Sequence, residues 1–181
     1  MNAFASRALL VIDIQKELFE KSTQIYAADR LLENICALID QAHSAQVPVF
    51  FIQHSSNKIL IQGTPGWQFH PRLQLLETDH IIQKHHGNAF EETNLDAELK
   101  ALGIKQLVIT GLVTHGCVKA TCLGAQALGY QVILVNDSHS NYHKKAEEVI
   151  EEWNRKLNQE GISLMNTQEI CFHAEKTSQS R

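Results

Sequence analysis

Residues 106–128 read QLVITGLVTHGCVKATCLGAQAL and contain one complete strand–turn–helix unit. Residues 106–110 form an apolar run typical of a buried strand, and residues 118–128 show helical periodicity. Cys117 lies between the two, where unpaired backbone N–H groups and the helix dipole stabilise an anion. This placement predicts that the thiolate, the nucleophilic form of cysteine, is favoured at Cys117. A small core residue near a helix start is an equally good interpretation of this stretch alone.

Strand-like and helical segments alternate along the rest of the chain. Strands are expected at residues 8–12, 47–52, 80–83, 106–110, 131–135 and 162–165, and helices at 28–45, 95–102, 118–128 and 144–159. Most of these strand runs are continuously apolar, which indicates burial on both faces, as in a parallel sheet covered by helices. The sequence therefore predicts an α/β fold of Rossmann type, a three-layer α/β/α arrangement around a mainly parallel six-stranded sheet.

Length and composition narrow the function classes. A chain of 181 residues is long enough for one domain and too short for two, so we expect one domain over residues 1–173 and a polar, flexible tail over 174–181. A net charge of −4 without a cluster of Lys and Arg argues against nucleic-acid binding. No apolar run approaches the roughly 20 residues that span a bilayer, and no signal segment precedes the first strand.

The cysteines are scattered and include no C-x-x-C pair, being Cys36, Cys117, Cys122 and Cys171. That pattern is typical of reduced thiols in a cytosolic protein, so we expect a cytoplasmic location.

Chemically useful side chains follow several of the predicted strands. Asp13 follows the first strand, Lys84 the third, Cys117 the fourth and Asp137 the fifth, and doubly wound sheets bind ligands beyond these carboxyl ends. A carboxylate beside a thiol can accept its proton, and a buried ammonium stabilises the anions of both. Taken singly, the carboxylates are compatible with caps or turns and the lysine with a solvated surface position. Together at one sheet edge they favour catalysis.

Four stretches of the chain carry a resemblance that covers about residues 6–170: LVIDIQ at 10–15, Lys84 with Phe90 after it, GLVT at 111–114 with Cys117, Val118 and Thr121, and Ala127 with Gly129 and Tyr130 before Asp137. With these motifs the chain resembles the isochorismatase-like cysteine hydrolases, a family that includes nicotinamidases and carbamoyl-amide hydrolases. The resemblance implies the isochorismatase-like variant of the predicted fold. Because the motifs lie at separate strand ends, their combination is far more specific than any one of them.

The resemblance implies a catalytic triad of Asp13, Lys84 and Cys117. It also implies a cis peptide between Leu112 and Val113, and an oxyanion hole made by the backbone N–H groups of Val113 and Cys117. The expected activity is that of an amidohydrolase, which cleaves a small amide, lactam or carbamoyl substrate through a thioester on Cys117. The resemblance further implies a homo-oligomer, either a dimer or a tetramer.

The substrate pocket is expected to involve Gln15, Phe19, His54, Trp67, Phe90 and His115. The long segment 53–78 leaves the carboxyl end of the second strand and contains Trp67, so it is interpreted as a pocket wall or lid, or else as a structural surface loop. The resemblance implies that the aromatic residues stack on a planar substrate, with core packing as the alternative, above all for Phe90. His54 is either a hydrogen-bond donor to substrate or an exposed loop residue.

No metal and no cofactor are expected. The resemblance implies that metal-dependent nicotinamidases carry an Asp-x-His motif after the second strand, and His54 and Ser56 stand at those positions here. The substitution also argues against nicotinamide as the substrate.

Two functions from other classes remain open from the sequence. The chain could be a small-molecule-binding or thiol-redox protein that uses Cys117 as a sensor, or a structural oligomer with a relict site. The presence of Asp13 and Lys84 favours the hydrolase, since a sensor needs no acyl-transfer triad.

Overall fold

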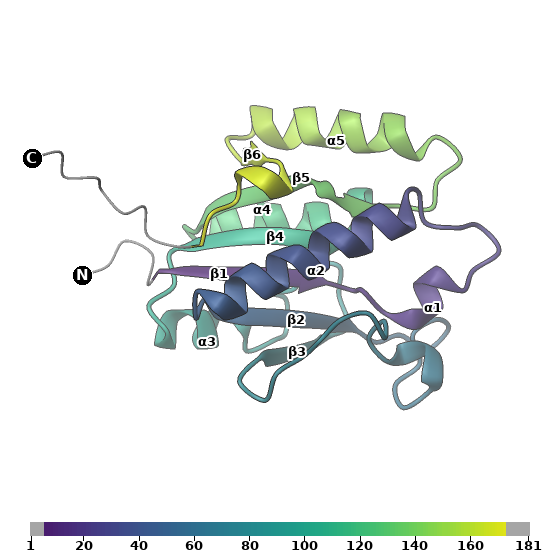
Figure 1. The fold of residues 1–181 in the computed structure, drawn as a ribbon, viewed down its shortest axis with the longest axis horizontal. Coiled ribbons are helices and arrows are strands. Elements are labelled where there is room, and N and C mark those ends of the chain that lie inside the picture. The colour runs from purple at the N-terminus through teal and green to yellow at the C-terminus, as the bar shows by residue number, and fades with distance from the viewer. Residues whose placement is uncertain (1–5, 173–181) are drawn as a thin grey trace, which may run out of the picture.

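Six parallel strands form the central sheet of the computed structural model, which describes residues 6–172 (Figure 1). The strands are β1 (Arg7–Ile12), β2 (Val49–His54), β3 (His80–Lys84), β4 (Gln106–Leu112), β5 (Gln131–Ser140) and β6 (Ser163–Met165). Their order across the sheet is β3-β2-β1-β4-β5-β6, and every neighbouring pair is parallel. The predicted α/β sheet is confirmed.

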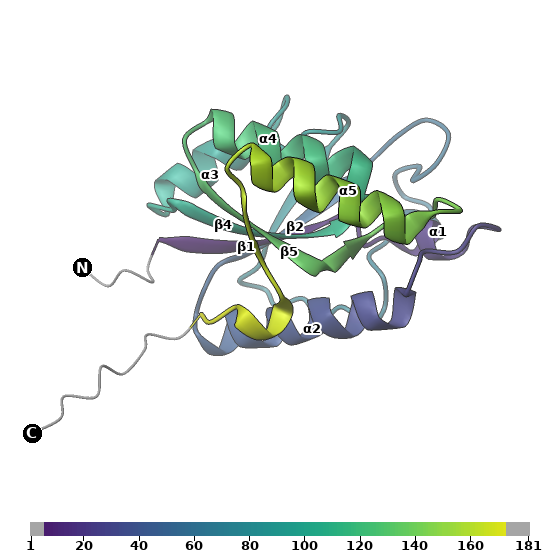
Figure 2. The same ribbon diagram turned by 90° about the horizontal axis from the view of Figure 1, so that it is seen from above.

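Helices cover both faces of this sheet. They are α1 (Lys16–Phe19), α2 (Ala28–Ser44), α3 (Leu95–Ala101), α4 (Lys119–Ala127) and α5 (Ala146–Gln159), with short turns at η1 (Pro65–Trp67), η2 (Thr114–Val118) and η3 (Thr167–Glu169). Helix α2 lies on one face, and α3, α4 and α5 lie on the other (Figure 2). The predicted three-layer arrangement is therefore confirmed.

Alternate residues of β1 belong to two separate apolar cores. Leu9 and Val11 pack in the core that contains the buried face of α2, whereas Leu10 and Ile12 pack in the core beneath α3, α4 and α5. All four side chains are at most 1% exposed. Burial on both faces explains why the strand is continuously apolar, since each such side chain contributes roughly 1.5–3 kcal/mol when removed from water.

The strand order reverses between β1 and β4, which lie side by side although β2 and β3 come between them in sequence. Gly111 of β4 pairs with Ile12 of β1 and has a φ of 121°. A Cβ atom at Gly111 would collide with the backbone of Ile12, so only glycine lets the two strands approach here. In doubly wound sheets this switch point is where ligands bind, and Asp13 is the next residue after β1.

Most boundaries of the predicted elements lie within two residues of the prediction, and two differences concern the region of the site. Strand β5 continues to Ser140 rather than ending at residue 135, with a register shift in which Ile109 pairs with Leu134 but Gly111 pairs with His139. Four residues of β5 thus oppose one residue of β4, and this bulge accommodates polar residues that resemble a loop in sequence. The helix expected from residue 118 begins at Lys119, after the π-helical turn η2 that contains Cys117.

No helix within residues 6–172 combines the length and the apolar character needed to cross a bilayer. The tail predicted at residues 174–181 lies outside the described part of the chain, and the single-domain boundary at 173 stays a prediction.

Candidate active site

The side chain of Lys84 joins the three residues predicted as a triad. Lys84 is the last residue of β3 and is fully buried, and its Nζ atom lies 3.0 Å from Asp13 Oδ2 and 3.2 Å from Cys117 Sγ. Asp13 is 3% exposed and Cys117 is half-buried. The carboxyl ends of β1 and β3 and the turn after β4 therefore bring a carboxylate, an ammonium and a thiol into direct contact. The solvated surface position considered for Lys84 is excluded.

Lys84 contacts more hydrogen-bond acceptors than it has protons. Besides Asp13 and Cys117, its Nζ lies 2.8 Å from His54 Nδ1 and donates to the His86 carbonyl at 3.2 Å. An ammonium carries three protons and no acceptor lone pair, so it cannot donate to all four groups at once. Because the ammonium has no lone pair, His54 Nδ1 must be the acceptor in its contact with Lys84. This assigns the imidazole proton to Nε2. Burial, followed by the charge of Lys84, lowers the pKa of His54, and both effects keep the ring neutral.

Burial and the neighbouring carboxylate favour the protonated form of the Cys117 thiol. Burial raises the pKa of Cys117 to about 12, the charge of Asp13 adds to this effect, and Lys84 opposes it. The prediction that the helix start favours the thiolate is therefore wrong, because desolvation and the neighbouring carboxylate outweigh the dipole. Within residues 6–172, Asp13 Oδ1 is buried without a hydrogen-bond partner, so one carboxylate oxygen is available to accept a proton.

Cys117 and Asp13 open into a small cavity of about 190 Å³. Its wall is made by Asp13, Leu18, Lys21, His54, Ser56, Ile59, Leu60, Val113, Cys117 and Tyr142. The long segment 53–78 forms part of this wall, to which it contributes His54, Ser56, Ile59 and Leu60. Leu18, Lys21 and Tyr142 could not be predicted as lining residues, since nothing in their spacing relates them to the strand ends.

The nucleophile turn begins with a cis peptide bond between Leu112 and Val113. The carbonyl of Val113 accepts the amides of Gly116, at 2.9 Å, and Val118, at 3.3 Å. Because that carbonyl is occupied within the turn, the amide is the remaining backbone polar group that Val113 can offer to a ligand. Val113 and Cys117 line the same cavity.

Gln15 and Trp67 support the cavity instead of lining it, which corrects their predicted role as pocket residues. The fully buried amide of Gln15 donates to the carbonyls of His54, at 3.0 Å, and Trp67, at 2.8 Å, and accepts the His54 amide at 2.9 Å. The indole of Trp67 donates to Ser55 Oγ at 2.8 Å. Both residues fasten the segment after β2 to the end of β1.

Of the other predicted pocket residues, His54 lines the cavity, whereas Phe19, Phe90 and His115 lie outside its wall. Phe19 packs against the His70 ring with centroids 4.7 Å apart. Phe90 stacks on Tyr130 at 5.8 Å and packs against the core beneath α4, so core packing is the correct interpretation of this residue. His115 is half-buried in the nucleophile turn and does not line the cavity.

The donor set at this site does not fit a resident metal ion. Asp13, His54 and Cys117 place one potential ligand atom each within 4.8 Å of one another, the sole such group of three in the described residues. The ammonium of Lys84 lies within 3.2 Å of all three side chains. A divalent cation bound there would meet this positive charge in a buried setting, where repulsion is strong. Ser56, at the second motif position, directs its hydroxyl to the Ile59 carbonyl.

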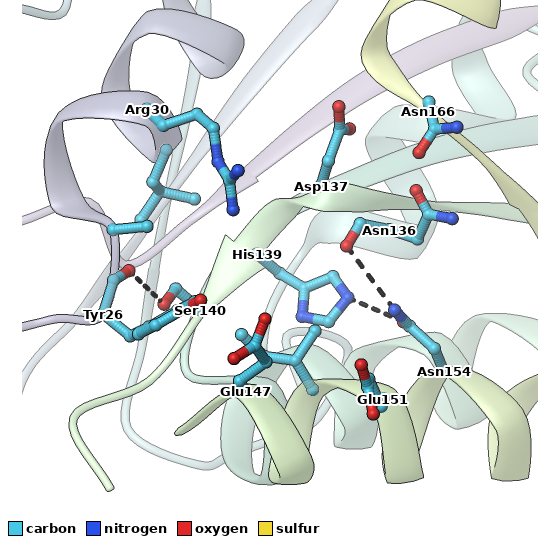
Figure 3. A pocket seen from close by; sticks show the side chains of 13 residues that line it. Tyr26, Arg30, Asn136, Asp137, His139, Ser140, Glu147, Glu151, Asn154 and Asn166 are labelled. Atoms are coloured by element: carbon cyan, nitrogen blue, oxygen red, sulfur yellow. Dashed lines mark hydrogen bonds between the residues drawn. The ribbon is translucent and has the colours of Figure 1, made fainter. Parts of the chain in front are cut away.

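A second cavity, of about 240 Å³, lies between the start of α2, the end of β5 and α5 and contains none of the three triad residues (Figure 3). His139 in its wall is buried and lies between Asn154 of α5, which accepts from Nε2 at 2.8 Å, and Thr114 of η2, whose Oγ1 is 2.9 Å from Nδ1. With Nε2 carrying the proton, Thr114 donates to Nδ1. His139 therefore ties α5 to the nucleophile turn.

We expect His139 to make the fold acid-sensitive. Burial lowers the pKa of His139 from 6.5 to about 4, so between these values the unfolded chain binds a proton that the folded chain does not. The contribution of His139 to the free energy of unfolding is complete above pH 6.5. It falls by about 3 kcal/mol as the pH is lowered toward 4. Urea unfolding should show that the difference in free energy of unfolding between the wild type and His139→Gln becomes smaller as the pH falls from 6.5 toward 4. A gap that stays constant with pH, or an equal change in the exposed control His143→Gln, would contradict this expectation.

Comparison with known proteins places this geometry in context. A family model described as an isochorismatase domain matches residues 7–168. The streptothricin hydrolase of Streptomyces noursei is 30% identical over 138 residues, which cover 75% of this chain and 50% of that protein. Nicotinamidase 3 of Arabidopsis thaliana is 27% identical over 118 residues, covering 56% and 57%. The chain spans about half the length of the curated relatives it matches. A crystal structure of an isochorismatase family protein superposes with a TM-score of 0.85 at 29% identity, covering 91% of this chain and 100% of that one.

Proposed function

Because the chain belongs to the isochorismatase family, we propose that it is a cysteine-dependent amidohydrolase that cleaves a C–N bond in a small amide, lactam or carbamoyl compound. The observation that carries this proposal is the contact of one buried ammonium, on Lys84, with both the Asp13 carboxylate and the Cys117 sulfur. The likeness to a streptothricin hydrolase and a nicotinamidase supports the choice of a C–N bond.

In the first half of the proposed reaction, Asp13 Oδ1 accepts the Cys117 proton as the sulfur attacks the substrate carbonyl carbon. The amides of Val113 and Cys117 are proposed to hold the oxyanion, a role supported by their place in the same cavity wall. Lys84 stabilises the charge that moves from Asp13 to the sulfur, because it contacts both. The protonated Asp13 then gives its proton to the leaving nitrogen, the C–N bond breaks, and a thioester remains on Cys117.

In the second half, water attacks the thioester carbonyl while Asp13 accepts one of the water protons. The C–S bond breaks, the carboxylic acid product leaves, and the proton on Asp13 returns to Cys117. No oxidant, cofactor or metal enters this cycle. The raised pKa of Cys117 fits it, since a thiol that ionises only with a base beside it is protected between turnovers. A peroxide sensor requires the opposite, a thiol with a low pKa.

The proposal predicts a covalent intermediate that can be observed. Incubation with a panel of amides, lactams and carbamoyl compounds should release ammonia or amine. After acid quenching and digestion, mass spectrometry should find the acyl group on Cys117. The fully buried Cys122 should carry no acyl group. Release that continues undiminished after complete alkylation of Cys117 would overturn the thioester mechanism.

We also propose that the chain acts in the cytoplasm as a homo-oligomer, a dimer or a tetramer. This follows from the family resemblance and from the reduced state expected of its cysteines.

A further inference from the structure

Lys21 places a positive charge without an anionic partner in the wall of the active-site cavity. The residue follows α1 and is half-buried, and its ammonium lies 4.5 Å from the centroid of the Tyr142 ring, which also lines the cavity. Within residues 6–172 it forms no salt bridge. A cation–π contact stabilises an ammonium without neutralising it, so the charge stays available to a ligand.

No other lining group balances this charge. The carboxylate of Asp13 is already paired with the ammonium of Lys84 at 3.0 Å. His54 is neutral and, with Nδ1 accepting from Lys84, has only the Nε2 proton to offer. The remaining lining residues carry no full charge. The cavity therefore presents one net positive charge, which favours an anionic ligand.

The cavity is small, which favours a compact ligand. Its volume of about 190 Å³ equals the space of about six water molecules and lies below the roughly 300–1,000 Å³ typical of drug-sized ligands. Cys117 and Lys21 line this same small space, so one compact molecule that fills it contacts both. Leu18, Ile59 and Leu60 supply an apolar wall for the part of the molecule in between.

We propose that Lys21 determines specificity by binding a carboxylate of the substrate, so that the substrate is a small amide that also bears a carboxylate. Half-amides of short dicarboxylic acids and N-carbamoyl amino acids have this chemistry. The inference rests on the proposed hydrolase function, which supplies the amide at Cys117. It excludes substrates whose second group is cationic, because an ammonium near Lys21 would be repelled.

Three substrates of nearly equal size test this inference. Succinamate carries a carboxylate, succinamide is neutral, and 4-aminobutanamide carries an ammonium. For the wild type, kcat/KM should be highest for succinamate, lower for succinamide and lowest for 4-aminobutanamide. In Lys21→Gln the ratio of kcat/KM for succinamate to that for succinamide should fall by about 10–100-fold, the usual effect of losing a hydrogen bond to a charged group. The loss should appear mainly in KM, and Lys21→Arg should retain the ratio.

Lys58→Gln is the matched control, since it removes the same charge from an exposed lysine of the segment after β2 that does not line the cavity. Its ratio should equal that of the wild type. An unchanged ratio in Lys21→Gln, or an equal change in Lys58→Gln, would overturn the role of Lys21. If neither these three compounds nor the panel of amides, lactams and carbamoyl compounds is hydrolysed, the proposed hydrolase function fails independently of the role of Lys21. Calorimetric binding of succinate to the wild type and to Lys21→Gln then decides the role of Lys21, and equal affinities would refute it.

Discussion

A Cys117→Ala variant is expected to lose at least about 10⁴-fold in kcat on every substrate that the protein hydrolyses, while remaining folded. The large loss follows because no other group near Lys84 and Asp13 can form the acyl intermediate. His54 is neutral, but its Nδ1 is occupied by the ammonium of Lys84. Alanine should be tolerated structurally, since Cys117 is half-buried and the substitution removes one sulfur atom, which lies 3.2 Å from the Nζ of Lys84. Initial rates of ammonia release, together with urea unfolding, measure both expectations.

Cys36→Ala is the matched control for this substitution. Cys36 is also half-buried, but its sulfur donates to the Arg72 carbonyl, and neither residue lines the active-site cavity. Its rates should equal those of the wild type. A Cys117→Ala protein that retains activity within tenfold of the wild type would show that the nucleophile is not this thiol. A variant that fails to fold is replaced by Cys117→Ser, which keeps the shape and should still lose most of the activity.

The layer architecture could be predicted because the relevant signals are local. The strands β1 and β4 are buried on both faces, and their nearly continuous apolar composition predicts this burial. The ends of these strands then place Asp13 and the turn with Cys117 at the switch point by topology alone. Parallel strands also bring Lys84, at the end of β3, to this edge, and the family resemblance implied that these three residues form a triad.

The cavity wall could not be predicted because it depends on long-range packing. Lys21 and Tyr142 lie 121 positions apart in sequence, after α1 and β5, and meet only in the folded chain. Trp67 and Phe90 were expected to contact substrate on the strength of their aromatic character, yet both are used to fasten loops or fill the core. Residue type shows what a side chain can do, and packing decides which surface it faces.

The state of the thiol was predicted with the wrong sign for a related reason. The helix dipole is visible in sequence as a strand–helix junction and contributes roughly 0.3–1 kcal/mol near a helix end. Desolvation and the charge of Asp13 depend on three-dimensional contacts, and together they raise the pKa of Cys117 to about 12. Desolvation, the largest of these effects, was invisible in the sequence.

Replacing Asp13 with asparagine is expected to lower kcat by about 10²–10⁴-fold, because the variant has no group to carry the proton from Cys117 to the leaving nitrogen. The same substitution should make the thiol easier to ionise. Burial and the charge of Asp13 raise the pKa of Cys117, whereas Lys84 lowers it, so removing the carboxylate leaves the effect of Lys84 opposed by burial alone. Thiolate forms as the pH rises, and its midpoint should lie at lower pH in Asp13→Asn than in the wild type.

Two measurements on one protein separate these effects. The rate of ammonia release reports proton transfer, and the pH dependence of iodoacetamide labelling at Cys117 reports ionisation of the thiol. A fall in turnover with a midpoint shifted to lower pH is expected only if Asp13 is the proton carrier and Lys84 stays in place. Turnover within tenfold of the wild type would contradict the role of Asp13, and a midpoint shifted to higher pH would show that Lys84 no longer contacts the sulfur.

The control for Asp13→Asn must account for the fold, since removing one partner of a buried ion pair typically destabilises by about 3–5 kcal/mol. Asp79→Asn provides it: the Asp79 side chain is 3% exposed and pairs with His43 at 2.9 Å, outside the wall of the active-site cavity. Both variants should unfold at lower urea concentrations than the wild type, but only Asp13→Asn should lose turnover under conditions where both are folded. Equal losses of activity in the two variants would mean that Asp13 acts through stability rather than through the proton it carries.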